Sequence, residues 1–274
     1  MSGRADASAL TGVSETALLT LRSRATEARR PDGIIDDPVA IELMDAIDFD
    51  FSKFGPTHGQ AMALRAVSFD NWTKRYLSAH PGATVVALAE GLQTSFWRLD
   101  EAVGHEFRWL TVDLPPIIEL RERLLPSSPR ISVRAQSALD YSWMDDVDAT
   151  QGVFITTEGL LMYLQPEEAL GLIAECARRF PGGQMMFDLP PRWATTLTRR
   201  RFVRSLRYRV PAMPFSMSPS EIADLIKTVP GIRAVHDKPL PRGRGTVFNT
   251  IVWTAQRLPQ LDPVRPTNTL LEFG

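Results

Sequence analysis

The chain has 274 residues, 44% of them hydrophobic, and its 31 Lys and Arg nearly balance its 32 Asp and Glu. The length allows one large α/β domain or two small ones, and a net charge of -1 gives no overall reason to expect nucleic acid or an anionic membrane as partner. No apolar run is long enough to span a bilayer, the N-terminus lacks the apolar core of a signal peptide, and the single cysteine, Cys176, excludes an internal disulfide, so we expect a cytoplasmic protein.

Helices are predicted for most of the first 80 residues. Residues 1–12 are small and polar, and we expect them to be a disordered tail. Apolar residues then recur at spacings of three and four, with Ser14 as a candidate N-cap. Asp36 or Asp37 caps a second predicted helix, and a third is expected over 58–79. Such a helical extension usually covers the ligand end of the sheet in α/β enzymes.

Strands that alternate with helices follow the Pro-Gly turn at residues 81–82. This alternation predicts a parallel sheet with both faces covered by helices. The predicted strands cover 84–88, 107–113, 131–135, 152–156 and 184–189, and the helices between them cover 94–103, 115–125 and 166–180.

The C-terminal part predicts an antiparallel closure of this sheet. A helix is expected over 218–229, capped by Ser218 or Ser220, and a strand over 232–237. A second, longer strand is predicted over 245–255, joined to the first through the glycine-rich turn PRGRG. Five parallel strands and this pair make one sheet of about seven strands.

No repeat or low-complexity linker divides the chain, so we expect a single domain over 13–274. Its predicted parts are a helical cap over 13–82, a core over 83–256 with a lid insertion at 190–217, and a C-terminal tail over 257–274.

Polar residues follow four of the predicted strands, at the edge where ligands bind in open α/β sheets. Gly91 lies in the turn after the first strand, and Asp113 ends the second, where two carboxylate oxygens suit the hydroxyls of a ribose. Residues 136–140 suit an adenine edge, and Glu158 follows the fourth strand. Each has another interpretation: Asp113 as a helix cap, Asp140 as a turn residue, Glu158 as a solvated side chain. Together they favour an adenosine-type site.

A resemblance to a known family rests on segments that occur in a fixed order: TALLTLRSRATEARRPDGIIDDPVA, ALRAVSFD, VVALAEGLQTSFWRL, TVDLP and EGLLMYL. Together these segments resemble the leucine carboxyl methyltransferase family, especially its bacterial branch of tetracenomycin-type polyketide O-methyltransferases, over about residues 13–190. The resemblance implies a class I methyltransferase fold, Rossmann-like, with strand order 3-2-1-4-5-7-6 and an antiparallel last strand. It also implies S-adenosylmethionine as the cofactor.

The resemblance assigns roles to charged residues of this sequence. Arg24 and Arg65 would hold the methionine carboxylate of the cofactor, since a guanidinium fork can bind a carboxylate bidentately. Arg65 lies in an otherwise apolar stretch, so its charge needs a partner. Glu158 would lie near the methionine amino group or the sulfonium. The remaining cofactor contacts fall on Ala89, Glu90, Gly91 and Gln93 in the turn, Asp113 and Leu114 at the ribose, and Ser137 with Ala138 or Leu139 at the adenine.

The turn after the first strand departs from the family pattern L-G-x-G-L-D-T-R, because this chain reads LAEGLQTS over 88–95. Ala89 replaces a glycine, and its methyl group is tolerated if φ stays negative. Gln93 replaces an aspartate and Ser95 the arginine expected to pair with it, so the two losses compensate each other. Weaker cofactor binding is the alternative consequence.

Neither a catalytic base nor a metal cluster is evident in the sequence. None of the histidines His58, His80, His105 and His236 follows a strand, and only His58 falls near the expected lid. Residues 190–217 interleave aromatic residues with arginines, which suits an acidic or aromatic methyl acceptor bound through Arg204 and Arg207. RNA binding is disfavoured by the balanced net charge.

Three functions follow, in order of preference. The first is an S-adenosylmethionine-dependent O-methyltransferase acting on a hydroxyl or carboxyl of a small molecule, for which a polyketide-like compound is the candidate. The second is a cofactor-binding protein of the same fold with altered activity, and the third an NAD-dependent oxidoreductase, which the absence of GxGxxG disfavours. The expected partner is a small-molecule methyl acceptor, with no nucleic acid and no membrane, and a homodimer stays open.

Overall fold

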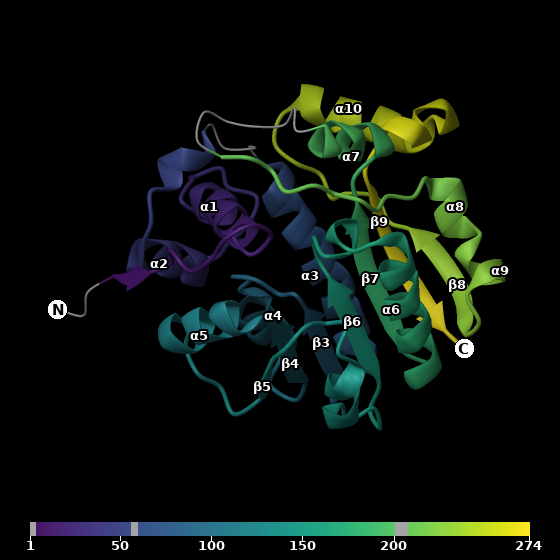
Figure 1. Ribbon diagram of the computed structural model, residues 1–274, viewed down its shortest axis with the longest axis horizontal. Helices are drawn as coiled ribbons and strands as arrows, with labels where there is room; N and C mark the ends of the chain where they lie inside the picture. Colours follow the sequence, from purple (N-terminus) through teal and green to yellow (C-terminus); the bar gives the residue numbers. More distant parts are fainter. Residues whose placement is uncertain (1–3, 56–59, 201–207) are drawn as a thin grey trace.

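A seven-stranded sheet lies between two layers of helices in the computed structural model, which describes residues 4–55, 60–200 and 208–274 (Figure 1). The strand order is β5-β4-β3-β6-β7-β9-β8; the first five are mutually parallel, and β9 runs antiparallel to β7 and β8. This confirms the predicted class I methyltransferase sheet. The strands are β3 Thr84–Leu88, β4 Arg108–Asp113, β5 Ile131–Ala135, β6 Val153–Thr157, β7 Gln184–Leu189, β8 Ile232–Asp237 and β9 Thr267–Phe273.

Alternate residues of each central strand face opposite helix layers, as the period of a strand requires. In β3, Val85 and Ala87 pack with the layer of α3 and α4, whereas Val86 and Leu88 pack with the layer of α6, α8 and α9. The helices are α3 Ala61–Ala79, α4 Ser95–Val103, α5 Pro115–Leu124, α6 Pro166–Arg179, α8 Pro219–Ala223 and α9 Leu225–Thr228. No helix among the described residues is long and apolar enough to cross a membrane.

The N-terminal cap consists of α1 (Thr16–Ala28), α2 (Pro38–Ala46) and a short pair of parallel strands, β1 (Ala5–Asp6) and β2 (Ile47–Asp48). Asp37 caps α2 by accepting from the Ala40 N–H at 3.0 Å, which confirms one of the two predicted caps. Ser14 is not a cap: α1 begins after Glu15, which makes no capping hydrogen bond through its side chain.

The expected disordered tail over 1–12 is wrong for residues 4–12. Ala5, Ala7 and Leu10 are buried in the core cluster of the cap, and β1 pairs with β2. The physical reason is that these small apolar side chains dock between the cap helices, which a composition of small and polar residues conceals.

The predicted strand over 245–255 is also wrong, because this segment forms the helix α10 (Thr246–Arg257). The antiparallel partner of β8 is instead β9, in what was expected to be a tail, and the glycine-rich segment PRGRG is not a hairpin turn. A short run of β-branched residues, such as the one in 245–255, fits either a strand or a helix. The sheet position beside β8 is taken by β9, in which nearly all residues are buried. The predicted helix over 218–229 is divided into α8 and α9, and Ser218 caps it as expected.

The predicted lid contains α7 (Arg192–Arg199), which lies above the carboxyl ends of the central strands (Figure 1). The indole N–H of Trp193 on α7 donates to the carbonyl of Val264 at 3.1 Å. Val264 ends the 3-10 helix η4 (Pro259–Val264), which follows α10. These elements and the cap therefore stand on either side of the strand ends.

Candidate active site

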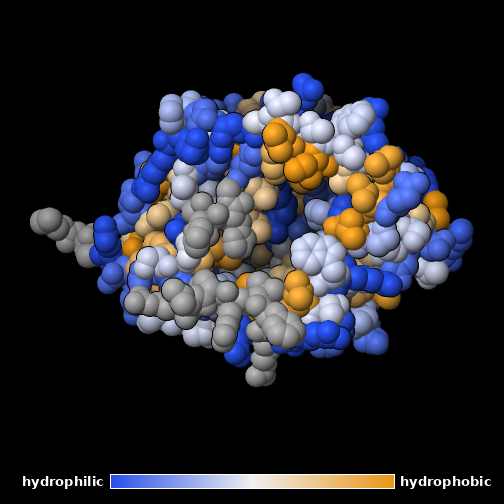
Figure 2. Space-filling view, turned by 90° about the horizontal axis from the view of Figure 1, so that it is seen from above, coloured by the Kyte–Doolittle hydropathy of each residue, from blue (hydrophilic) through white to orange (hydrophobic). Residues whose placement is uncertain are grey.

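A cavity of about 780 Å³ opens at the carboxyl ends of β3, β4, β6 and β7. It lies between α1 of the cap and α7 of the lid segment, and Figure 2 looks onto this face of the molecule. Its volume falls in the range of roughly 300–1,000 Å³ that small-molecule sites occupy. Apart from Arg24, all the residues to which the sequence gave cofactor contacts line it.

The turn after β3 begins with Ala89, the only non-glycine residue with a positive φ (51°) in the described part of the chain. The condition given for tolerating its methyl group, a negative φ, is therefore not met. Its N–H donates to the carbonyl of Val112 at 2.7 Å, so the chain is still tied to β4 where it must turn. Gly91 also has a positive φ of 59°, and a Cβ there would lie 3.1 Å from the Cβ of Ala17. The left-handed conformation costs an L-residue about 1–2 kcal/mol, so Ala89 is strained.

Glu90 stabilises this turn through a buried ion pair with Arg121 of α5, in which the Nη2–Oε2 distance is 2.9 Å. Nη1 of Arg121 donates to the carbonyls of Gly91 and Gln93 at 2.9 and 2.8 Å. Thr111 donates to the same Glu90 oxygen at 2.6 Å. The contacts of Glu90 thus hold the backbone of the loop in place.

Asp113, at the end of β4, faces the turn. Its Oδ2 accepts from the N–H of Gly91 at 2.6 Å and its Oδ1 from the N–H of Leu114 at 2.7 Å. Burial raises the pKa of Asp113 to about 6, although these two hydrogen bonds oppose the shift. It is not the cap of α5, since Leu114 occupies that position. Each carboxylate oxygen retains acceptor capacity for a further donor, as a ribose hydroxyl requires.

The loop after β5 lines the cavity with Ser137, Ala138 and Leu139. Ser137 Oγ accepts from the N–H of Leu139 at 3.2 Å, which shapes the loop locally. Asp140 accepts from the N–H of Ser142 at 3.2 Å, so its role is that of a turn residue.

Arg65 is held by two carboxylates at the floor of the cavity. Its Nε lies 3.0 Å from Oε1 of Glu158, and its Nη1 lies 3.2 Å from Oδ2 of Asp188. Burial alone would lower the pKa of Arg65, but the charges of Asp188 and Glu158 raise it above its ordinary value. The other oxygen of Glu158 accepts from Gln93 Nε2 at 2.6 Å. The expectation that the charge of Arg65 has a partner is thus confirmed, with two carboxylates in place of one. Glu158 is not a solvated side chain, because both of its oxygens accept hydrogen bonds from protein groups.

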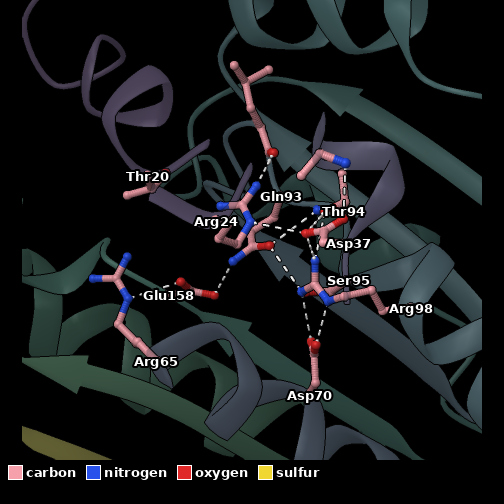
Figure 3. A network of polar contacts seen from close by, with 12 residues as sticks. Thr20, Arg24, Asp37, Arg65, Asp70, Gln93, Thr94, Ser95, Arg98 and Glu158 are labelled. Atoms are coloured by element: carbon pink, nitrogen blue, oxygen red, sulfur yellow. Dashed lines mark hydrogen bonds and ion pairs between the residues drawn. The ribbon is translucent and has the colours of Figure 1, made fainter. Parts of the chain in front are cut away.

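Arg24 lies behind this floor, only 1% exposed (Figure 3). Its Nη2 donates to the carbonyl of Leu92 at 2.6 Å, and its Nε lies 3.5 Å from Asp37. Nη1 has no hydrogen-bond partner among the described residues. Figure 3 shows the guanidinium beside Thr20 and Gln93, two residues that line the cavity. A buried donor without a partner fits the carboxylate of a ligand.

Arg98 of α4 is a part of the site that the sequence did not reveal. It donates to Gln93 Oε1 at 3.2 Å and to Ser95 Oγ at 2.9 Å, and it pairs with Asp37 at 2.5 Å and Asp70 at 2.7 Å (Figure 3). A guanidinium therefore reaches Gln93 from a position one helical turn beyond the serine. The spacing of three residues on a helix was the signal that could have revealed it.

Asp188 and Tyr163 were also missed, and both line the cavity. Asp188 lies near the end of β7 much as Asp113 ends β4, and its Oδ1 accepts from the N–H of Gly159 at 2.7 Å. Burial raises the pKa of Tyr163 to about 12, against the opposing charge of Arg65. The described histidines do not line the cavity, and His58, Arg204 and Arg207 lie outside the described residues.

Comparison with known proteins gives a family match over residues 17–177, to leucine carboxyl methyltransferase. The tetracenomycin polyketide synthesis O-methyltransferase TcmP of Streptomyces glaucescens is 34% identical over 226 residues, which cover 82% of each chain. The S-adenosyl-L-methionine-dependent methyltransferase dpfgK of Gibberella zeae is 26% identical, over 82% of this chain and 81% of its own.

Solved structures agree on the fold. A DUF574 family protein from Streptomyces avermitilis superposes with a TM-score of 0.59 at 16% identity, covering 94% of this chain and 97% of its own. A protein from Thermobifida fusca superposes with a TM-score of 0.55 at 14% identity, and the match covers 93% of this chain and 94% of that protein.

Proposed function

The chain belongs to the leucine carboxyl methyltransferase family and is an S-adenosylmethionine-dependent methyltransferase, and we propose that it methylates a hydroxyl or carboxyl oxygen of a small, largely apolar molecule. The observation that carries this proposal is the cavity at the strand ends, whose walls are mostly apolar. The charged residues among its lining, Arg65, Glu90, Asp113, Glu158 and Asp188, belong to the ends of the strands, the β3 turn and the Arg65 cluster. We further propose that cap, core and lid form one domain around this cavity.

In this proposal the cofactor lies along the strand ends. Its ribose would donate to Asp113, and its adenine would lie against Ser137, Ala138 and Leu139. Nη1 of Arg24 would bind its carboxylate. The bound cofactor supplies a methyl group already activated by a sulfonium, so the protein needs chiefly to orient the acceptor and exclude water.

Glu158 would accept from the amino group of the cofactor, because its two oxygens are fixed by Arg65 and Gln93 and both retain acceptor capacity. Arg65 itself already bonds to two carboxylates, so in this proposal it orients Glu158 and Asp188 rather than holding the carboxylate alone.

The acceptor would occupy the part of the cavity between α7 and the strand ends. Trp193, Met213 and Leu240 line that part with apolar surface. Transfer to a carboxylate needs no base, whereas a hydroxyl must lose a proton, and Asp188 lines the cavity as the candidate to receive it. The resemblance to TcmP supports a polyketide-like acceptor.

Calorimetric titration tests the cofactor part of the proposal. We expect the protein to bind S-adenosylmethionine and S-adenosylhomocysteine but not NAD, and Arg24→Met to weaken both at least tenfold. Arg29→Met is the matched control, because Arg29 is an exposed residue of the same region that pairs with Asp45 on the surface. A folded protein that binds neither adenosyl compound would refute the assignment. A screen of hydroxy and carboxy acceptors with labelled methyl groups then tests the acceptor.

The strained Ala89 favours a second candidate, a protein that binds the cofactor but turns it over poorly. Cofactor binding without transfer to any acceptor of the screen is the outcome that this candidate predicts.

A further inference from the structure

The helix α10 carries exposed apolar side chains, and no residue in it is buried. Val247 is 75% exposed, Ile251 63% and Trp253 55%. A surface helix of a globular protein normally turns its apolar residues toward the core. The α10 patch is defined here as these three residues together with Leu258 and Val264 after the helix and Trp193 on α7, all of them about half exposed or more.

The segments that carry the α10 patch are basic. The sequence has no Asp or Glu between Asp188 and Glu221, and none between Asp237 and Asp262. Among the exposed arginines of these segments, Arg199, Arg200 and Arg242 make no ion pair within the described ranges. Arg257 is also exposed, and its guanidinium lies 4.5 Å from the ring centroid of Trp253. The whole chain nevertheless has a net charge of -1, so the rest of it is acidic. The two segments that carry the patch are therefore both basic and apolar on their exposed surface.

The α10 patch is continuous with the mouth of the cavity. Trp193 and Val264 belong to the patch and also line the cavity, as does Leu197 on α7, which is 36% exposed. Figure 2 shows apolar residues around the hollow on this face, interspersed with hydrophilic ones. An apolar ligand could therefore pass between this face and the cavity without crossing bulk water.

We propose that the α10 patch docks onto an anionic lipid bilayer. Val247 and Ile251 lie one helical turn apart on α10, and the patch adds two exposed tryptophans, with arginines in the same segments. Exposed apolar residues combined with arginines are the composition of surfaces that lie in the membrane interface. The arginines would contact lipid phosphates, since each basic residue near such a surface contributes about 1 kcal/mol of attraction. A second copy of the chain fits less well, because two cationic faces repel each other. This docking is independent of the proposed function.

Sedimentation with lipid vesicles tests the proposal on the full chain. We expect the protein to bind vesicles of equal parts phosphatidylcholine and phosphatidylglycerol and not vesicles of phosphatidylcholine alone, with affinity falling as salt rises. The double variant V247S/I251S should bind at least about tenfold more weakly, because it loses the aliphatic groups that enter the interface. The double variant R199Q/R200Q should bind roughly thirtyfold more weakly, at about 1 kcal/mol per arginine.

The control is Ile226→Ser, since Ile226 on α9 is 45% exposed and lies away from α10 (Figure 1). It should bind vesicles as the unmodified chain does, and the melting temperatures of all variants should agree. Absence of binding to the anionic vesicles, or equal binding by V247S/I251S, would overturn the proposal. It would also be overturned if V247S/I251S dissociated a dimer while the unmodified protein ignored vesicles, since the patch would then be an interface between copies.

Discussion

Replacing Ala89 by glycine should stabilise the protein, although it removes a methyl group from the edge of the core. An L-residue in the left-handed region costs about 1–2 kcal/mol, and Ala89 has a φ of 51°. Glycine avoids this cost but loses about 0.4–1 kcal/mol through the greater freedom of the unfolded chain. The difference favours Ala89→Gly by roughly 0.5–1 kcal/mol, which corresponds to a rise in melting temperature of about 2 °C for a chain of this size.

Thermal and urea unfolding without ligand measure this effect. The matched control is Ala138→Gly, because Ala138 lines the same cavity, is 7% exposed and has no positive φ. It should be destabilised by about 0.5–1 kcal/mol or more. The reasoning is refuted if Ala89→Gly lowers the unfolding free energy by more than about 1 kcal/mol, since the methyl group would then contribute more by packing than it costs in strain. Ala89→Gly should also bind S-adenosylhomocysteine at least as tightly as the unmodified chain.

Four further predictions concern the charged groups around the turn. Asp113 has a pKa of about 6 in the folded chain and an ordinary pKa of 3.8, so between these values the folded chain retains a proton that the unfolded chain has lost. The free energy of unfolding should therefore fall by about 2 kcal/mol from pH 4 to 6 and by about 3 kcal/mol over the whole titration, and Asp113→Asn should abolish this fall in urea titrations. Cofactor affinity, measured by calorimetry, should rise through pH 6 as Asp113 ionises and stay flat in the variant. Arg98→Met should lower the unfolding free energy by about 3–5 kcal/mol, because Asp70 loses its guanidinium partner and Asp37 keeps only the more distant Arg24. A loss under about 1 kcal/mol would contradict the inference that these ion pairs stabilise the fold. Arg121→Met should lower the unfolding free energy by a similar amount, because it leaves the buried Glu90 carboxylate without its guanidinium, and it should weaken cofactor binding. Adding Glu90→Gln removes that unpaired charge and should recover part of the lost stability.

The sheet and most of the cavity could be predicted because their signals are local. A strand such as β4 ends in an acid, and the carboxyl ends of neighbouring parallel strands meet, so Asp113 and Glu158 were found from their positions along the chain. The same rule would have found Asp188 had it been applied to β7. Arg98 and the docking of residues 4–12 were missed because they depend on packing between segments distant in sequence.

The helix α10 was missed because its apolar residues fit both a strand and a helix, and burial could not decide between them when no residue of it is buried. Net charge hid the basic character of this face in the same way, since an average over the chain cancels a surface asymmetry. The net charge of the whole chain therefore gave no reason to expect a membrane partner, although single segments of the chain are basic.

The polar network beneath the cavity contains one more carboxylate than guanidinium: Arg24, Arg65 and Arg98 face Asp37, Asp70, Glu158 and Asp188. With the cofactor bound as proposed, such a floor would distinguish its two forms by charge, since only the methylated form carries a sulfonium. Its field would attract the incoming cofactor more strongly than the spent one. Each turnover would then have an electrostatic direction, in which loss of the methyl group itself weakens binding of the product.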